Sequence, residues 1–317
     1  MTTTTAAPIV IDKPGVYDIP AHVYHGDPVP GGSLSSTGAR KLLPPSCPAL
    51  FKHWLEHGQA PKDEFDFGSA AHRLVLGVGA EIAEIKADSW RSPATREEAD
   101  EHRAAGRIPL LSRDVETVHA MADALRAHPI ASALFRPGTG RAEQTLVWRE
   151  IGHYTEGSAD HERGFVVLPQ PVHCRALVDW LPSYSPNRGE RPAHPSRLLL
   201  PDYKTCASAA PDDAVKSIAR YGYHIQGAFY LAGLRALGLA DESARFLLVM
   251  QEKTAPYLVT VIEPDATAMR LGARRCREAI DTYARCAATG RWPGYSDDVV
   301  LAELPPWETR ELEGQIW

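Results

Sequence analysis

One short segment constrains the fold more than any other: an apolar run that ends in an acid, one spacer and a lysine. It reads Leu198-Leu199-Leu200-Pro201-Asp202-Tyr203-Lys204-Thr205. Such a run predicts a strand. Side chains two apart on a strand point to the same face, so Asp202 and Lys204 share one side while Tyr203 points away. Pro201 cannot donate a hydrogen bond to a ladder, which predicts an edge strand or a strand near its end.

A second predicted strand, from Arg175 to Leu181, carries Asp179. If the two strands pair antiparallel, Asp179 lies beside Asp202. Two carboxylates that close repel each other, so a proton or a cation must occupy the site. Carboxylate oxygens suit Mg²⁺ or Mn²⁺, and such an ion can polarise a phosphodiester and generate hydroxide from bound water. Lys204 would orient that water or stabilise negative charge that develops on the phosphorus centre.

The Asp-x-Lys tripeptide alone is weak evidence, because it occurs by chance in most proteins and can be an ordinary solvated strand end. Two helical patterns near it add weight. Gln226 and Tyr230 are spaced to share one face of a helix. Gly68 stands one turn before His72, where a small residue lets another backbone or a DNA strand approach closely. Considered without a family, His72 is more simply a core histidine.

Apolar periodicity divides the chain into an arm, one domain and a tail. Residues 1–33 predict an irregular N-terminal arm, residues 34–136 a helical part, residues 137–290 an α/β core, and residues 291–317 a C-terminal tail. Helices are predicted at about 37–43, 47–57, 66–77, 211–220, 222–238 and 264–289, and over most of 94–135 with a break near Pro109. Strands are predicted at 144–148, 173–181, 197–202, 245–251 and 257–262, with polar, turn-rich stretches at 152–170 and 183–196.

Composition excludes several classes of protein. The 317 residues are 44% hydrophobic, which is enough for a substantial core. Five cysteines without a Cys-x-x-Cys pair argue against a structural zinc site, a disulfide framework or an iron–sulfur cluster. The net charge of −6 argues against binding nucleic acid through overall charge, although a local basic rim can surround an acidic metal site. No apolar run is long enough to cross a bilayer, so we expect a cytoplasmic protein with no membrane partner.

Taken as a group, these motifs resemble a known family. The set consists of Asp179, Asp202-Tyr203-Lys204-Thr205, Gln226-x-x-x-Tyr230 and Gly68-x-x-x-His72. It is similar to the RecB-type branch of the PD-(D/E)XK nucleases, and closest to the RecE (exonuclease VIII)-like exonucleases of phages and prophages. Residues 34–43 and 47–51 resemble the first two helices of that domain. The likeness covers roughly residues 16–290 and implies a restriction-endonuclease-like core, with a mixed central sheet flanked by helices.

The resemblance also implies roles for individual residues. Asp179, Asp202 and His72 would bind the Mg²⁺ or Mn²⁺ ion, and Glu143 would be a further acidic member. Lys204 would be the catalytic lysine, while Gln226 and Tyr230 would shape the site or touch DNA. Apart from the resemblance, the basic side chains that could contact phosphates are Arg40, Lys41, Arg73, Arg175, Lys216 and Arg220, although most surface arginines and lysines have no such role. Tryptophans and tyrosines are spread along the chain and give no sign of a stacking platform.

The leading hypothesis is a metal-dependent exonuclease that degrades one strand of linear duplex DNA from an end. The likeness implies digestion from 5′ to 3′ that leaves a 3′ single strand for recombination, a single-strand annealing protein as partner, and a homo-oligomer. Two alternatives stay open: an endonuclease or flap nuclease on the same scaffold, and a catalytically inactive DNA- or protein-binding module. The stretch at 183–196 lengthens the gap between Asp179 and Asp202, which makes their pairing the least secure part of the prediction.

Overall fold

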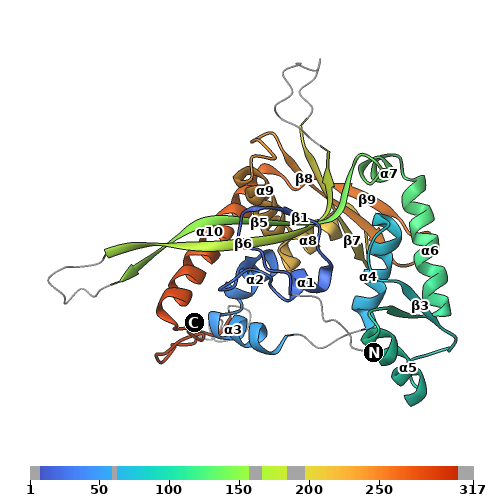
Figure 1. Cartoon of the computed structure of the whole chain (residues 1–317), viewed down its shortest axis with the longest axis horizontal. Helices are drawn as coiled ribbons and strands as arrows, with labels where there is room; N and C mark the ends of the chain where they lie inside the picture. The colour runs from blue at the N-terminus through green and yellow to red at the C-terminus, as the bar shows by residue number, and fades with distance from the viewer. Residues whose placement is uncertain (1–7, 59–62, 157–165, 184–196, 306–317) are drawn as a thin grey trace, which may run out of the picture.

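The computed structural model of the protein describes residues 8–58, 63–156, 166–183 and 197–305 (Figure 1). Its helices are α1 (Ala21–His25), α2 (Ser36–Leu42), α3 (Pro48–His57), α4 (Asp63–Leu76), α5 (Pro93–Ala104), α6 (Ser112–Ala127), α7 (Pro129–Leu134), α8 (Pro211–Tyr221), α9 (Tyr223–Ala236) and α10 (Ala266–Thr289). Its strands are β1 (Gly15–Tyr17), β2 (Leu34–Ser35), β3 (Ile82–Ile85), β4 (Ile108–Leu111), β5 (Gly140–Glu156), β6 (Val166–Pro182), β7 (Leu199–Cys206), β8 (Arg245–Glu252) and β9 (Val259–Ile262). None of the described helices has both the length and the apolar character to span a membrane.

Two groups of strands form the central layer. The first has the order β1-β5-β6-β2, in which β5 and β6 make a long antiparallel ribbon that extends beyond the body of the molecule (Figure 1). The second has the order β7-β8-β9, in which β7 and β8 are parallel and β9 is antiparallel to β8. Within the described residues, β6 lies beside β7 without sharing a ladder with it. The predicted mixed α/β class is confirmed.

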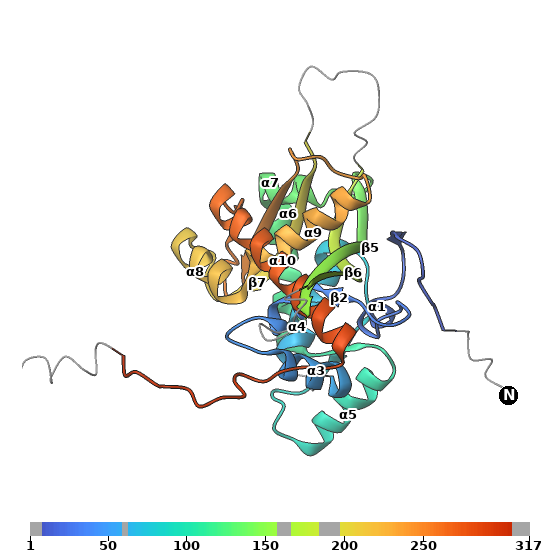
Figure 2. The ribbon, with the colours of Figure 1, turned by 90° about the vertical axis from the view of Figure 1, so that its left-hand side faces the viewer.

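Helices cover both faces of this layer. On one face, α9 and α10 lie side by side (Figure 2), and Phe229 of α9 packs against Trp148 of β5 with ring centroids 4.9 Å apart. On the other face, α4 and α6 cover a second core that contains Met121, Tyr203 and Val249. Successive side chains of a strand enter opposite faces. β8 and the first part of β7 are therefore buried on both sides, which accounts for the continuous apolar run of β8.

The β5–β6 ribbon twists from one core to the other at Asp179. Val178 belongs to the core beneath α9 and α10, whereas Trp180 belongs to the core beneath α4 and α6. A regular strand keeps residues two apart on the same face, so the strand is distorted between them. The β5–β6 ladder skips Glu143 and Asp179, which lie between the Ala142–Trp180 and Gln144–Val178 pairs, and the Glu143 φ of 46° lies in the left-handed region. Asp179 therefore stands where the two cores meet.

The N-terminal segment packs more regularly than predicted. β1 pairs antiparallel with β5, and Ile11, Tyr24 and Val29 are buried against Val147 of that strand. The prediction of an irregular arm over residues 1–33 was wrong for this part. Its apolar residues are separated by prolines and glycines and show no helix or strand period, so their burial could not be inferred from spacing.

Several other limits also differ from the prediction. Residues 152–156 and 166–170, predicted as turns, belong to the projecting ribbon, where polar side chains are compatible with a strand exposed to solvent. The remaining parts of the predicted turn stretches, 157–165 and 184–196, lie outside the described residues. β3 and β4 form a small parallel pair that was not predicted. After α10, Trp292 packs against Phe51 and Tyr283, and the following residues to 305 lead away from the body (Figure 2).

Candidate active site

Strand β7 carries the acid and the lysine on one face, as predicted. The Lys204 ammonium forms an ion pair with the Asp202 carboxylate, and the Asp202 side chain is only 1% exposed. Tyr203 points the other way, is fully buried, and donates its hydroxyl to Oε1 of Gln251 at 2.6 Å. Strand alternation thus separates the charged pair from the core beneath α4 and α6.

Asp179 reaches this pair by a route other than the predicted one. The antiparallel pairing considered from the sequence does not form within the described residues, because β6 and β7 belong to separate ladders. Instead, Oδ2 of Asp179 accepts a hydrogen bond from the backbone N–H of Tyr203 at 2.7 Å. Residues two apart direct their N–H groups to the same side of a strand, and Pro201 has no N–H to offer to β6. A side-chain carboxylate therefore takes the place of a ladder bond between the two strands.

Helix α9 holds the carboxylate of Asp202 in place. The Gln226 amide nitrogen donates to Oδ1 of Asp202 at 2.8 Å and to the Tyr230 hydroxyl oxygen at 3.0 Å. An amide nitrogen carries two hydrogens, so both bonds can form at once. Gln226 and Tyr230 are both buried, at 7% and 6% exposure. The predicted spacing on one helical face is confirmed.

Helix α4 brings His72 to the other side of Asp179. Its Nδ1 lies 3.7 Å from Oδ2 of Asp179, and its ring packs edge-on against the Tyr203 ring. Burial, followed by the positive charge of Lys204, lowers the pKa of His72 to about 4. The imidazole is therefore neutral near pH 7, which is the form that can act as a metal ligand.

Burial dominates the acid–base properties of the charged groups. It raises the pKa of Asp202 to about 6, with Lys204 opposing that shift and Asp179 adding to it. It also raises the pKa of Asp179, against the effects of Lys204 and the Tyr203 N–H. Burial acts to lower the pKa of Lys204, but the two aspartates outweigh it and raise that pKa. One ammonium thus faces two carboxyl groups, which together favour a further cation.

Glu143 lies at the edge of this group. Its side chain is half-buried, and its pKa is raised by burial and then by the negative charge of Asp179. A carboxylate this close to Asp179 is within electrostatic reach of the site, as expected for a further acidic member.

The donor set fits a hard divalent cation. Oδ2 of Asp202 is buried and makes no hydrogen bond, although it lies against the Lys204 ammonium. Across residues 8–58, 63–156, 166–183 and 197–305, no three His, Cys, Asp or Glu side chains form a ready-made metal cage. Mg²⁺ usually keeps several waters and takes one or two carboxylates rather than a complete protein cage. Asp179 and Asp202 would hold it, with His72 and Glu143 as further donors.

The basic residues predicted to contact DNA fall into two groups. Arg175 is 4% exposed, forms an ion pair with Asp27 and donates to the Ser33 carbonyl, so it ties the N-terminal segment to β6. The prediction that it contacts phosphates was wrong. The side chains of Arg40, Lys41 and Arg73 are half-buried and remain candidates.

Two residues near the site were missed in the sequence. Gln251 is fully buried in β8 and donates to the Met121 carbonyl at 2.8 Å while it accepts from Tyr203. A glutamine beside the apolar run 246–250 was the available signal. Tyr223 places its ring centroid 5.4 Å from the Lys204 ammonium nitrogen. Nothing in the local sequence marks Tyr223 as a neighbour of a residue nineteen positions earlier.

The architecture and the comparisons with known proteins together show a protein with the PD-(D/E)XK nuclease fold. A crystal structure from Eubacterium rectale, of a protein to which exonuclease activity is ascribed, matches with a TM-score of 0.52 and 13% identity. The match covers 90% of this chain and 94% of that chain, and at this identity it shows the fold alone. A phage-related exonuclease from Haemophilus somnus 129PT matches at 12% identity over 82% of this chain and 96% of that one. Its TM-score of 0.28 is too low to support an argument.

A sequence-family model also matches part of the chain. Residues 193–304 match the family described as a PDDEXK-like domain of unknown function (DUF3799). That range contains Asp202, Lys204, Gln226 and Tyr230 but not His72 or Asp179. Comparison with curated proteins gives no match. The predicted likeness to the PD-(D/E)XK superfamily is confirmed by the fold and the family model together.

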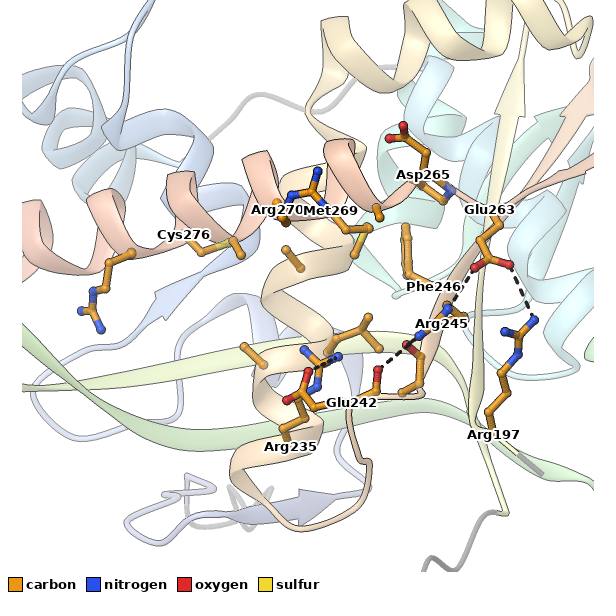
Figure 3. A pocket seen from close by; sticks show the side chains of 18 of the residues that line it. Arg197, Arg235, Glu242, Arg245, Phe246, Glu263, Asp265, Met269, Arg270 and Cys276 are labelled. Carbon is orange, nitrogen blue, oxygen red and sulfur yellow. Dashed lines mark hydrogen bonds and ion pairs between the residues drawn. The ribbon is translucent and has the colours of Figure 1, made fainter. Parts of the chain in front are cut away.

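An open pocket of about 860 Å³ lies elsewhere, between α9, α10 and the start of β8 (Figure 3). Its walls include Leu231, Phe246 and Met269, and at its rim Glu263 forms an ion pair with Arg245. Among the predicted site residues, none lines this pocket. The chemistry of the buried carboxylates, and not the size of a cavity, therefore identifies the candidate active site.

Proposed function

We propose that the protein is a Mg²⁺- or Mn²⁺-dependent deoxyribonuclease that removes nucleotides from an end of linear duplex DNA. One observation carries the proposal: β6, β7, α4 and α9 converge on the buried carboxylate of Asp202 and the half-buried carboxylate of Asp179, with Lys204 beside them. Acids of raised pKa, close to a charged partner, are common at catalytic sites.

Each side chain has a defined part in this chemistry. Asp179 and Asp202 would hold the divalent ion, which would polarise the phosphodiester and lower the pKa of water so that hydroxide is available as the nucleophile. The carboxylates keep Lys204 protonated, so its compact ammonium can stabilise negative charge on the phosphate oxygens. Gln226 fixes the orientation of Asp202 and is itself bonded to Tyr230.

The mode of cleavage rests on resemblance. Exonuclease activity is ascribed to the Eubacterium rectale protein of the same fold, which favours end-dependent digestion over internal cleavage. The RecE-like motifs favour digestion from 5′ to 3′, a 3′ single strand as product, and an annealing protein as partner. A flap nuclease on the same scaffold is one alternative, and an endonuclease and an inactive binding module are the two that the digestion experiment separates.

The test is digestion of end-labelled linear duplex and of covalently closed circles in the presence of Mg²⁺. The parent should digest the linear form and spare the circle. Asp202→Asn, which removes the charge but keeps an oxygen for Gln226, should abolish digestion. Asp18→Asn, at an exposed carboxylate, is the matched control and should be fully active. Cutting of circles would indicate an endonuclease, and DNA binding without any cleavage would indicate the inactive module.

A further inference from the structure

Two tyrosines that lie on either side of one glycine form a ledge next to the candidate active site. α8 ends and α9 begins at Gly222, whose φ of 66° is left-handed. Tyr221 closes one helix and Tyr223 opens the next, and their ring centroids lie 5.7 Å apart with planes inclined by 33°. We call Tyr221 and Tyr223 the tyrosine ledge. The sharp junction at Gly222 brings together rings that ordinary helical spacing would separate.

The ledge leads from the lysine of the site to solvent. The Lys204 nitrogen lies 5.4 Å from the centroid of the Tyr223 ring, which is half-buried. Burial raises the pKa of the Tyr223 hydroxyl, and the positive charge of Lys204, the next largest influence, opposes that shift. Tyr221, the outer member, is 49% exposed. A tyrosine that served only to fill the core would be buried more completely than this.

Positive charges flank the outer tyrosine. The Arg220 guanidinium lies 5.6 Å from the Tyr221 ring centroid, and Arg40 of α2 donates to the Tyr221 carbonyl. A Cβ on Gly222 would come within 2.8 Å of the Arg40 side chain, so glycine keeps Arg40 close to the junction. The result is an aromatic surface bordered by cations, beside a buried acidic centre.

We propose that the tyrosine ledge stacks unpaired nucleobases of the DNA strand whose phosphodiester reaches Lys204. The inference rests on the proposed nuclease function, and it adds that the site accepts DNA in single-stranded form. Aromatic rings stack on any base, and guanidinium groups pair with phosphates, so the ledge binds single-stranded DNA without regard to sequence. A duplex end must therefore open by at least one base pair before cleavage.

The first test measures stacking without cleavage. The probe is a short duplex with a single-stranded 5′ overhang that contains 2-aminopurine, mixed with the protein in Ca²⁺. Stacking should quench the fluorescence. Tyr221→Ala and Tyr223→Leu should weaken binding about ten-fold each, the scale of one lost base–aromatic stack, whereas Tyr221→Phe and Tyr223→Phe should bind as the parent does. Tyr295→Ala, at a tyrosine 75% exposed on the C-terminal segment, is the matched control.

A second test needs no variant. Replacing the unpaired nucleotides of the overhang by abasic sites should weaken binding to the parent about ten-fold and raise KM, with kcat little changed. The same replacement should not weaken DNA binding by the Tyr221→Ala protein any further. Equal affinity of the parent for normal and abasic overhangs would overturn the ledge even if digestion is normal. Quenching that depends on Tyr221 in a protein that never cleaves would support the ledge and defeat the nuclease.

Discussion

At the scale of single residues, Lys204 is the group whose chemistry is best defined by its surroundings. Asp202 and Asp179 raise the pKa of Lys204 and keep its half-buried ammonium protonated. We predict that Lys204→Ala lowers the single-turnover rate about 10²-fold or more, as when an electrostatic stabiliser is removed. Lys204→Arg should also lower the single-turnover rate, because a planar guanidinium does not replace a compact ammonium. Lys86→Ala, at an exposed lysine, should retain full activity.

Metal affinity distinguishes this role from a structural one. Calorimetric titration with Mn²⁺ should give similar affinities for the parent and for Lys204→Ala. Loss of metal binding, together with a normal rate per bound ion, would mean that Lys204 only organises the carboxylates.

The raised pKa of Asp202 predicts how activity depends on pH. As pH falls through about 6, Asp202 takes up a proton and loses its affinity for a cation, so kcat/KM should fall. His72, with a pKa of about 4, stays neutral over this range and does not cause the loss. Because metal binds the deprotonated acid, a higher Mg²⁺ concentration should move the midpoint to lower pH. A midpoint that does not respond to Mg²⁺ would exclude Asp202 as the titrating ligand.

The same shift has an opposite consequence for stability without metal. The folded-state pKa of Asp202 exceeds its ordinary value of 3.8, so the native protein binds this proton more tightly than the unfolded chain does. The contribution of Asp202 to stability is therefore greatest below about pH 4 and is lost as pH rises towards 6. Near neutral pH, the ionised Asp202 carboxylate therefore lowers the stability of the metal-free fold, although this ionised form is the one that would bind the metal.

The arrangement of the candidate site residues could be predicted from sequence where the relation between two residues is local. Asp202 and Lys204 follow from strand alternation, and Gln226 and Tyr230 from helical spacing. The position of Asp179 depends on a side-chain hydrogen bond to Tyr203 in place of a ladder, which no periodicity encodes. Arg175 was misassigned because an arginine in a strand looks the same whether its partner is a phosphate or Asp27.

At the scale of elements, the crossing of α9 and α10 holds the site together. Gly272 of α10 packs so tightly that a Cβ there would lie 2.2 Å from the His224 carbonyl oxygen of α9. A backbone atom cannot move aside like a side chain, so Gly272→Ala should destabilise the fold by about 3 kcal/mol. Chemical denaturation should show the loss, and cleavage should weaken because α9 carries Gln226.

Gly68→Ala is the matched control for that substitution. Gly68 lies in α4 with open space around the position of a Cβ, so alanine should stabilise the helix by up to about 1 kcal/mol. Equal stability of Gly272→Ala and the parent would mean that the two helices can separate freely. A loss of DNA binding in a stable Gly68→Ala protein would support the prediction that DNA approaches this glycine.

Elements with a strong period were easier to predict than those defined by their partners. α6 and α10 have apolar positions three and four residues apart, and both lie within the predicted helical ranges. β1 and β2 are only three and two residues long and exist because β5 and β6 offer them hydrogen bonds. The projecting ribbon (residues 152–156 and 166–170) contributes no described residue to the buried core clusters. Its sequence therefore lacks the alternation by which a half-buried strand is recognised.

At the scale of the whole molecule, the overall charge and the proposed substrate conflict. The net charge of −6 opposes association with DNA, so the attraction must come from local cations such as Arg40 and Arg220. The tyrosine ledge offers a contact that does not depend on charge. Salt should therefore weaken the binding of a single-stranded overhang less steeply than a contact made through phosphates alone.

An acidic monomer that removes one nucleotide at a time would lose its substrate often. We predict that the protein assembles into a closed homo-oligomeric ring around DNA, as the RecE-like resemblance implies, because enclosure retains the duplex without strong phosphate contacts. Light scattering should give a mass that is a multiple of the 34.7 kDa chain. Labelled linear duplex, chased with excess unlabelled DNA after the reaction starts, should continue to shorten over many nucleotides. A monomeric mass with digestion that stops at the chase would exclude the ring, since a protein that releases its DNA after each cut cannot enclose it.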